Sequence, residues 1–385
     1  MLMGKLLINI ILMILVTLPA RSDTFLISLF NEHSLSAIVV SADRGTYRLV
    51  ADGNDEGVYG ENDILYITMH GDSLLIRNQS GRIGVCSAAS FNEIDEFSVF
   101  SLRPADPVTE RSFYFGSLDI SVEFGRLRII NRVDEHNYLA GVVEAEAGTG
   151  WPRMFYRVQA IISRTYLYGN ISRHADEGFH LCDDVHCQVY KGRLSGNETI
   201  YEAVSLTDRL VIVTEDNSLI TAAYHSNCGG QTVNSEDVWL VHRPYLRSVN
   251  DPYCLNSRNA VWEAGINTDK WADYLRRMGF AMVAAKPDPQ LFAFRQQVRR
   301  SFYNIGDVSI PFRILRNDWG LRSAWFDIRV ANPSDRLLIR GRGHGHGVGL
   351  CQEGAMEMAA RGYNFIDILQ FYYTGVKIKR YEDLF

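Results

Sequence analysis

The sequence is poor in cysteine and carries no excess of basic residues. Six cysteines in 385 residues are too few for a small disulfide scaffold, although they suffice for one bridge and one metal site. With 39 Lys and Arg against 45 Asp and Glu, the formal net charge of −6 argues against nucleic acid as a partner. Beyond the N-terminus, no run is apolar enough to cross a membrane. The composition, 46% hydrophobic and 22% charged over this length, predicts a globular protein of two or three domains.

Residues 1–22 have the features of a secretory signal peptide. Lys5 precedes an apolar stretch, Leu6–Leu18, and the small residues Ala20 and Ser22 follow it in a spacing that suits signal peptidase. The stretch is shorter than the ~20 apolar residues of a spanning helix, and a retained N-terminal anchor is the alternative. We therefore expect an exported protein, located in the periplasm, in the cell envelope or secreted, where disulfides can persist.

Residues 23–110 have the pattern of a small N-terminal β-rich domain. Short apolar runs alternate with turns rich in Gly, Asn and Asp. The expected strands are Thr24–Phe30, Ser36–Ser41, Ile64–Met69 and Ser73–Ile76. This region holds no convergent set of catalytic residue types, so we expect it to support the rest of the chain.

From residue 111 onward the pattern mixes strands and helices, which predicts an α+β fold. Apolar residues at helical spacing and a proline in the first turn predict a helix over Pro152–Tyr168. Thr268 is the expected N-cap of a second helix, Asp269–Met278, in a segment, 265–310, that we interpret as a helical insert. The other expected elements are strands at Phe113–Val122, Leu127–Asn131, Tyr138–Val143, Trp325–Val330 and Arg336–Ile339, a solvated basic helix face at Arg295–Arg300, and helices at Glu353–Ala360 and Phe365–Tyr373.

Two glutamates, Glu144 and Glu146, follow the apolar run Tyr138–Val143 just ahead of a helix. A carboxylic acid at the end of a buried strand has its pKa raised by desolvation, which suits a general acid. The alternative is that both are surface glutamates, favoured by the dipole at a helix N-terminus. Their spacing does not separate the two interpretations.

Four motifs, in matching order over about residues 113–379, resemble the SpoIID/LytB family of stage II sporulation protein D and amidase enhancer relatives. They are YLAGVVEAEAG from Tyr138, VQAIISRTY from Val158, HSNCGGQTVNSEDVW from His225 with PYL from Pro244, and GRGHGHGVGLCQEGA from Gly341 with the helix that contains Tyr372 and Tyr373. The resemblance implies that residues 111–385 form a catalytic domain. Its expected architecture is a mixed, β-rich core with a few helices lining a cleft.

The resemblance also implies an activity, lytic transglycosylation of peptidoglycan. The glycan backbone is cleaved between MurNAc and GlcNAc, and anhydro-muramyl ends form. The essential glutamate of the family aligns with Glu146 rather than Glu144. Glu146 would protonate the glycosidic oxygen and then accept the proton of the sugar's C6 hydroxyl, so no second catalytic carboxylate is required. Arg164 aligns with the family's arginine and is expected either to bind substrate or to form a structural salt bridge.

The family has a non-enzymatic branch, which supplies the alternative function. In that branch, the resemblance implies, the fold binds the cell wall and modulates a separate cell-wall amidase. Peptidoglycan glycan strands are the expected partner in either case, and an amidase is a further partner in the second. The presence of both Glu146 and Arg164 favours the enzyme.

Two cysteines and three histidines lie within His174–Cys187, and this grouping indicates a metal site. Two thiolates and two imidazoles suit tetrahedral zinc, although the spacing is not that of a zinc finger. A disulfide or two free thiols are the alternatives. Some family members hold a zinc ion near the active site, so the resemblance favours a structural zinc ion. The expected ligands are Cys182, His186, Cys187 and His174, with His180 as the alternative to His174.

Cys228 and Cys254 are the expected disulfide pair. A bridge between them would close a loop of ~25 residues and stabilise the fold by roughly 3.5 kcal/mol in the chain-entropy model. Cys86 and Cys351 are expected to be unpaired, and Cys351 stands where many family members have serine.

The glycine-rich segment 341–347 is not a phosphate loop, because it lacks the Lys-Ser/Thr pair that such loops carry. Its glycines permit close approach of the backbone to a neighbour. The wall of a polysaccharide cleft, a structural turn and a pair of metal ligands are the three interpretations. By motif position, the expected cleft residues are His344, His346, Tyr224, His225, Ser226, Glu236 and Gln352.

Overall fold

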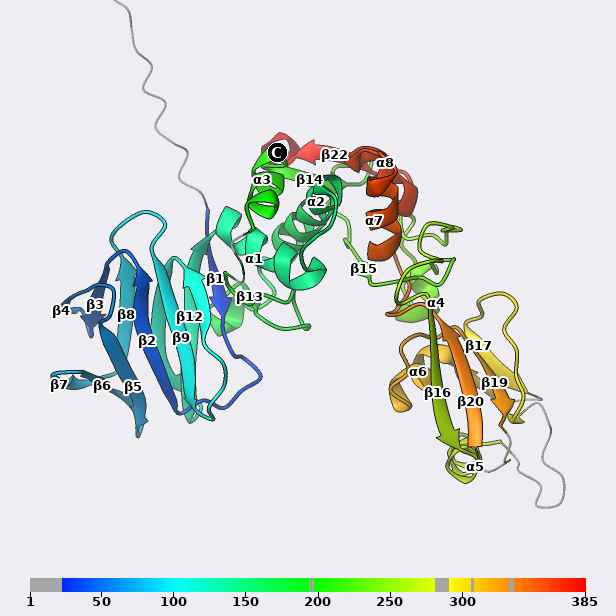
Figure 1. Ribbon diagram of the computed structural model, residues 1–385, viewed down its shortest axis with the longest axis horizontal. Helices are drawn as coiled ribbons and strands as arrows, with labels where there is room; N and C mark the ends of the chain where they lie inside the picture. The colour runs from blue at the N-terminus through cyan, green and yellow to red at the C-terminus, as the bar shows by residue number, and fades with distance from the viewer. Residues whose placement is uncertain (1–22, 194, 196, 281–290, 306–307, 332–335) are drawn as a thin grey trace, which may run out of the picture.

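The computed structural model describes residues 23–193, 195, 197–280, 291–305, 308–331 and 336–385. The expected signal peptide, 1–22, lies outside these residues. The fold is α+β, with a two-sheet unit, a helical middle and a smaller unit of strands and helices placed in a row (Figure 1). Within the described residues, no helix combines the length and apolarity that a membrane crossing needs.

The N-terminal part is a sandwich of two sheets. Its strands are β1 (Thr24–Ser28), β2 (Ala37–Arg44), β3 (Tyr47–Ala51), β4 (Asn54–Tyr59), β5 (Ile64–His70), β6 (Ser73–Asn78), β7 (Gly81–Cys86), β8 (Ala88–Glu93), β9 (Val99–Asp106), β10 (Ser112–Phe115), β11 (Ser117–Glu123), β12 (Arg126–Asp134) and β13 (Leu181–Cys182). One sheet has the order β13-β1-β12-β11-β8-β3-β4 and the other the order β10-β9-β2-β5-β6-β7. Their apolar faces meet where Tyr47 stacks on Phe91 and contacts Phe100 of the opposite sheet edge-on.

The sandwich continues past residue 110, where we expected it to end. Strand β10 pairs with β9, β11 with β8, and β12 with β1, so the two strands expected to open the second region instead complete both sheets. Strand β1 also pairs in parallel with β13, with Ile27 opposite Leu181 and Ser28 opposite Cys182. The N-terminal strand is therefore the direct neighbour of the segment that carries the Cys and His residues.

The helical middle follows the sandwich (Figure 1). Its helices are α1 (Glu135–Ala147), α2 (Arg153–Gly169), the 3-10 turn η1 (Ala175–Glu177), α3 (Glu198–Leu206), α4 (Ser235–Trp239), α7 (Gln352–Ala360) and α8 (Phe365–Tyr372). Its short strands are β14 (Leu210–Val213) paired with β22 (Lys377–Arg380), and β15 (Tyr224–His225) paired with β21 (Leu350–Cys351), and the 3-10 turn η3 (Tyr381–Leu384) ends the chain. Helix α2 packs against α1, α3, α7 and α8, which makes it the centre of this part. The structure confirms the helices expected over 152–168, 353–360 and 365–373.

The run Tyr138–Val143 is helical, so the predicted strand is wrong. Asp134 caps α1 by accepting a hydrogen bond of 2.9 Å from the Asn137 N–H. The helix is then buried on nearly every side, so its sequence shows no polar face and none of the 3.6-residue periodicity that identifies surface helices. Because residues two apart on a helix point in different directions, Glu144 and Glu146 do not form a pair.

The third part, over residues 261–342, has a hydrophobic core of its own. Its elements are β16 (Val261–Asn267), α5 (Thr268–Arg277), β17 (Phe302–Ile305), β18 (Val308–Pro311), α6 (Phe312–Asp318), β19 (Phe326–Val330) and β20 (Arg336–Arg342). The segment 265–310, expected to be a helical insert, thus contains strands as well as α5 in its described part. Asn267 rather than Thr268 caps α5, because its Oδ1 accepts from the N–H groups of residues 269 and 270 at 3.0 Å.

The basic run Arg295–Arg300 is not a helix face, contrary to the prediction. Arg299 turns inward and donates from Nη1 to the carbonyl oxygens of Cys228 at 3.1 Å and Gln231 at 2.9 Å. Arg300 donates its backbone N–H to Oε1 of Gln296 at 2.9 Å. This run therefore joins the third part to the loop after β15.

Candidate active site and metal centre

Glu146 lies in the last turn of α1 with its side chain half-buried. Its Oε1 accepts a hydrogen bond of 2.9 Å from the backbone N–H of Val189, and the hydroxyl of Tyr224 bonds to the same carboxyl group. Burial raises the pKa of Glu146, and the hydrogen bonds from Val189 and Tyr224 offset this only in part. The negative end of the helix dipole acts in the same direction as burial. Glu146 therefore keeps its proton to a higher pH than a free glutamate, which is what a general acid needs.

Glu144 faces another side of α1 and is buried. Its Oε1 accepts hydrogen bonds from the hydroxyl and the backbone N–H of Ser195. Oε1 of Glu144 therefore holds the loop before α3.

The segments that face Glu146 come from distant parts of the chain. In the parallel pair β15–β21, Tyr224 lies opposite Leu350, and His225 opposite Cys351. Gln352 follows at once, and its Nε2 contacts the carbonyl oxygen of Glu146 at 3.5 Å. Burial raises the pKa of Tyr224 well above its ordinary value, so its hydroxyl keeps the proton that it shares with Glu146. The motifs around His225 and Gly341 thus converge on the end of α1.

His225 and His346 lie beside this convergence. Their ring centroids are 5.4 Å apart, and the ring of Trp239 lies 5.2 Å from that of His346. Burial lowers the pKa of His346 to about 4, and it lowers the pKa of His225 well below its ordinary value. Both imidazoles are therefore neutral at neutral pH, and this wall adds no positive charge beside Glu146.

The glycine-rich segment is a tight turn packed on the loop after β15. His344 and Asn227 exchange two backbone hydrogen bonds of 3.0 and 2.8 Å. Gly343 has φ +78°, and a Cβ there would stand 2.6 Å from the carbonyl oxygen of Asn227. The close contact with the backbone of Asn227 explains why residue 343 is a glycine. At His346, Nδ1 accepts a hydrogen bond of 3.0 Å from the N–H of Val348.

Glu236, one of the expected cleft residues, forms a side-chain ion pair. Glu236 in α4 forms a two-pronged ion pair with Arg247, with N–O distances of 2.7 and 2.6 Å, which lowers the pKa of Glu236 to about 2. Ser226 uses its carbonyl oxygen to accept the N–H of Glu353. The Glu236 side chain therefore links α4 to the loop that carries Arg247.

Arg164 has the structural role that was one of its two expected roles. Its guanidinium is 1% exposed, and Nε donates to Oε1 of Glu135 at 2.5 Å. The remaining donors bind carbonyl oxygens of Val204 at 3.2 Å and Thr207 at 2.7 Å, at the C-terminal end of α3. Glu135 and Glu146 stand at opposite ends of α1, so Arg164 holds the helices together and lies away from the acid.

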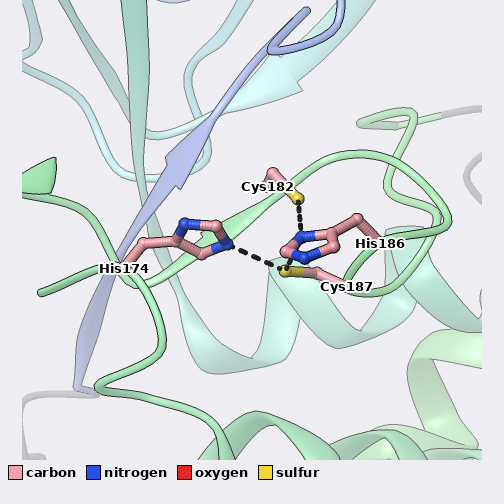
Figure 2. Close-up of side chains that lie close together, drawn as sticks. All are labelled: His174, Cys182, His186 and Cys187. Carbon is pink, nitrogen blue, oxygen red and sulfur yellow. Dashed lines mark hydrogen bonds between the residues drawn. The ribbon is translucent and has the colours of Figure 1, made fainter.

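The predicted metal ligands His174, Cys182, His186 and Cys187 converge (Figure 2). Nε2 of His174 lies 3.4 Å from Sγ of Cys187, and Nδ1 of His186 lies 3.6 and 3.8 Å from the two sulfurs. Metal bonds of about 2.0–2.3 Å in a tetrahedron require ligand separations of roughly 3.3–3.8 Å. The four side chains therefore fit a tetrahedral Cys2His2 site in both chemistry and spacing.

His180 is not part of this cluster. Its Nδ1 accepts the backbone N–H of Leu26 in β1 at 3.1 Å. Sequence reasoning missed a residue that orients one of the ligands: Oε1 of Glu177 lies 2.5 Å from Nδ1 of His174. The spacing of Glu177, three residues after His174, was the available signal.

The sulfur atoms of Cys228 and Cys254 are 3.4 Å apart and are not bonded, so the predicted disulfide is absent. Cys351, expected to be an isolated buried thiol, lies in the same cluster together with Asp251. All six cysteines are within the described residues, and all are free thiols.

The chain is similar to members of the SpoIID/LytB family. Residues 123–213, which include Glu146 and the His174–Cys187 cluster, match the family model described as stage II sporulation protein. The chain is 27% identical to stage II sporulation protein D of Bacillus subtilis over 263 residues, 65% of this chain and 75% of that protein. It is 29% identical to an uncharacterized protein of Brachyspira hyodysenteriae over 275 residues, 70% and 73% of the two chains. It is also 27% identical to the amidase enhancer of Bacillus subtilis, over 63% of this chain and 40% of that protein.

Proposed function

We propose that the protein is an exported cell-wall enzyme, a lytic transglycosylase that cleaves peptidoglycan glycan strands. The observation that supports this most directly is Glu146, a half-buried carboxyl group with a raised pKa that receives two hydrogen bonds at the meeting point of the family motifs. A protein that only binds the wall has no use for such an acid.

In the proposed reaction, the Glu146 carboxyl donates its proton to the glycosidic oxygen as the bond from that oxygen to C1 of MurNAc breaks. The C6 hydroxyl of the same MurNAc then attacks C1, and its proton returns to the Glu146 carboxylate. Atoms and charges balance without water as a nucleophile. The Val189 N–H and the Tyr224 hydroxyl stabilise the carboxylate between the two proton transfers.

A zinc ion held by His174, Cys182, His186 and Cys187 has a structural role in this proposal. Four protein ligands leave no open position for substrate or water. The ion would fix the segment that runs from Cys187 to Val189, and with it the N–H group that contacts Glu146.

The test is digestion of purified glycan strands, followed by mass spectrometry for anhydro-muramyl ends. Wild-type protein is expected to produce them, and Glu146→Gln is expected to lower the rate by about 10²–10⁴-fold, the usual contribution of a general acid. Glu144→Gln is the matched control, because it makes the same chemical change two residues away on another side of α1 and should retain most activity.

The similarity to an amidase enhancer makes a second outcome informative. If folded wild-type protein leaves the strands intact but binds insoluble peptidoglycan and accelerates a cell-wall amidase, the enzyme proposal is overturned and a modulator of that amidase replaces it.

A further inference from the structure

Three thiols and a carboxyl group meet in the interior, apart from the Cys2His2 cluster. Cys228, Asp251, Cys254 and Cys351 are each 0% exposed. Sγ of Cys228 lies 3.4 Å from Sγ of Cys254 and 3.2 Å from Oδ2 of Asp251, and all four ligand atoms are within 4.8 Å of one another. They come from the loop after β15, the loop before β16 and the end of β21.

The spacing suits four ligands around one ion better than it suits a disulfide. A disulfide requires sulfur atoms about 2.05 Å apart and leaves the third thiol and the carboxyl group without a function. Zinc–sulfur bonds of about 2.3 Å in a tetrahedron place the sulfur atoms roughly 3.8 Å apart. The separation of 3.4 Å between Cys228 and Cys254 is close to the second value and far from the first.

Hydrogen bonds orient two of the four side chains, Asp251 and Cys351. Tyr372 donates its hydroxyl to Oδ2 of Asp251 at 2.9 Å, and the Tyr253 N–H donates to Oδ1 at 2.9 Å. The N–H of Cys228 points to Sγ of Cys351 at 3.3 Å. Hydrogen bonds of this kind orient carboxylate and thiolate ligands in metal sites.

Two further features fit a charged site. A Cβ on Gly354 would stand 2.4 Å from Oδ2 of Asp251, so only glycine leaves the carboxylate its position. Arg299 donates to the carbonyl oxygen of Cys228 at 3.1 Å. Three thiolates and a carboxylate around a divalent cation carry a net charge of −2, which the guanidinium of Arg299 offsets in part.

We propose that Cys228, Asp251, Cys254 and Cys351 bind a structural zinc ion, separate from the ion of the His174–Cys187 cluster. Soft thiolate ligands in a tetrahedral, fully buried set favour zinc over magnesium or calcium. The ion fastens two loops to the first turn of α7. Because Tyr224 lies four residues before Cys228 and Gln352 one residue after Cys351, it fixes the wall that faces Glu146. Zinc binding at these four residues does not require that the protein cleaves glycan.

The experiment uses the chain from residue 23 carrying Cys182→Ser and Cys187→Ser, so that the Cys2His2 site is lost. Elemental analysis is expected to find one zinc per chain, and cobalt added in its place should give the intense visible bands of tetrahedral thiolate coordination. Adding Cys351→Ser should remove the metal and the bands. Adding Cys86→Ser, a buried cysteine outside both clusters, should leave them unchanged.

Thiol counting makes the test independent of how the variants fold. Wild-type protein is unfolded in denaturant with a chelator and no reductant, alkylated and analysed by mass spectrometry. Alkylation of Cys228, Cys254 and Cys351 together supports the site, provided that the wild-type protein contains two zinc ions per chain. A Cys228–Cys254 disulfide in the metal-free protein, or three free thiols without bound metal, overturns it.

Discussion

The backbone N–H of Val189 donates a 2.9 Å hydrogen bond to Oε1 of Glu146, and Val189 stands two residues after Cys187. The proposed acid is thus bonded directly to the segment that the Cys2His2 cluster anchors. A backbone donor is positioned only by the conformation of its own chain, so the geometry at Glu146 depends on how firmly that segment is held.

Removing the imidazole of His174 should therefore release the metal ion and disturb the hydrogen bond from Val189 to Glu146. We expect His174→Ala to bind one zinc ion per chain fewer than wild type and to lower glycan cleavage at least about 10-fold, by disturbing the Val189 contact. His180→Ala is the matched control: His180 bonds to Leu26 outside the cluster, so its variant should keep zinc. Elemental analysis and activity are measured on both proteins. Zinc loss from His180→Ala with retention in His174→Ala would contradict the ligand assignment.

Replacing Tyr224 by phenylalanine should shift the pH dependence of cleavage upward. The Tyr224 hydroxyl stabilises the Glu146 carboxylate and so lowers the pKa of Glu146, while burial raises it. Without the hydroxyl, the carboxyl stays protonated to a higher pH. Since the first step requires the protonated acid, the alkaline limb of kcat/KM should move up by about one pH unit. Tyr66→Phe, at an exposed site on β5, should not move it, and a downward shift in Tyr224→Phe would contradict the assignment.

Arg164→Met should destabilise the fold rather than weaken substrate binding. It leaves the 5% exposed carboxylate of Glu135 without its buried partner, which typically costs about 3–5 kcal/mol. Arg164→Lys should recover only part of the loss, since a lysine cannot reproduce the forked contacts to α3. Chemical denaturation measures the free energy of unfolding. Unchanged stability combined with a raised KM for glycan would show that Arg164 contacts substrate after all.

Gly141→Ala should destabilise α1 although alanine is the better helix former. The new Cβ would lie 2.5 Å from the Gly192 carbonyl oxygen and 2.7 Å from a ring carbon of Tyr190. Overpacking of this kind costs about 1–3 kcal/mol, more than the gain of about 1 kcal/mol in helix propensity. Gly169→Ala, at the end of α2 with nothing within 4 Å of its Cβ, is the control and should be neutral or slightly stabilising. Equal free energies of unfolding for the two variants would contradict the close approach of Gly192.

The sequence predicted elements well where apolar residues recur at the spacing of a helix. Helix α2 shows apolar residues at helical spacing and a proline before its first turn, so its bounds were predicted within one residue. Helix α1 is enclosed by other elements, and its apolar run has the same appearance as a buried strand. The error at Tyr138–Val143 thus reflects burial, which removes the periodicity on which such predictions depend.

Contacts between distant residues limited the prediction of the site. His174, Cys182, His186 and Cys187 are close in sequence, and their grouping was visible in it. Cys351 joins Cys228 and Cys254 only through the pairing of β15 with β21, which no spacing reveals. Whether Arg164 faces substrate or Glu135 likewise depended on where α1 begins and α3 ends, which the sequence does not reveal.

Strand β1 lies between β12 and β13, so the first residues of the fold acquire their second neighbour only when Leu181 and Cys182 are in place. The hydrogen bond from Leu26 to His180 spans 154 positions of the chain. Contacts of such long sequence separation close slowly, because the loop entropy is lost before the contact forms. A chain that emerges N-terminus first therefore keeps its opening strand incompletely paired until nearly half its length has followed.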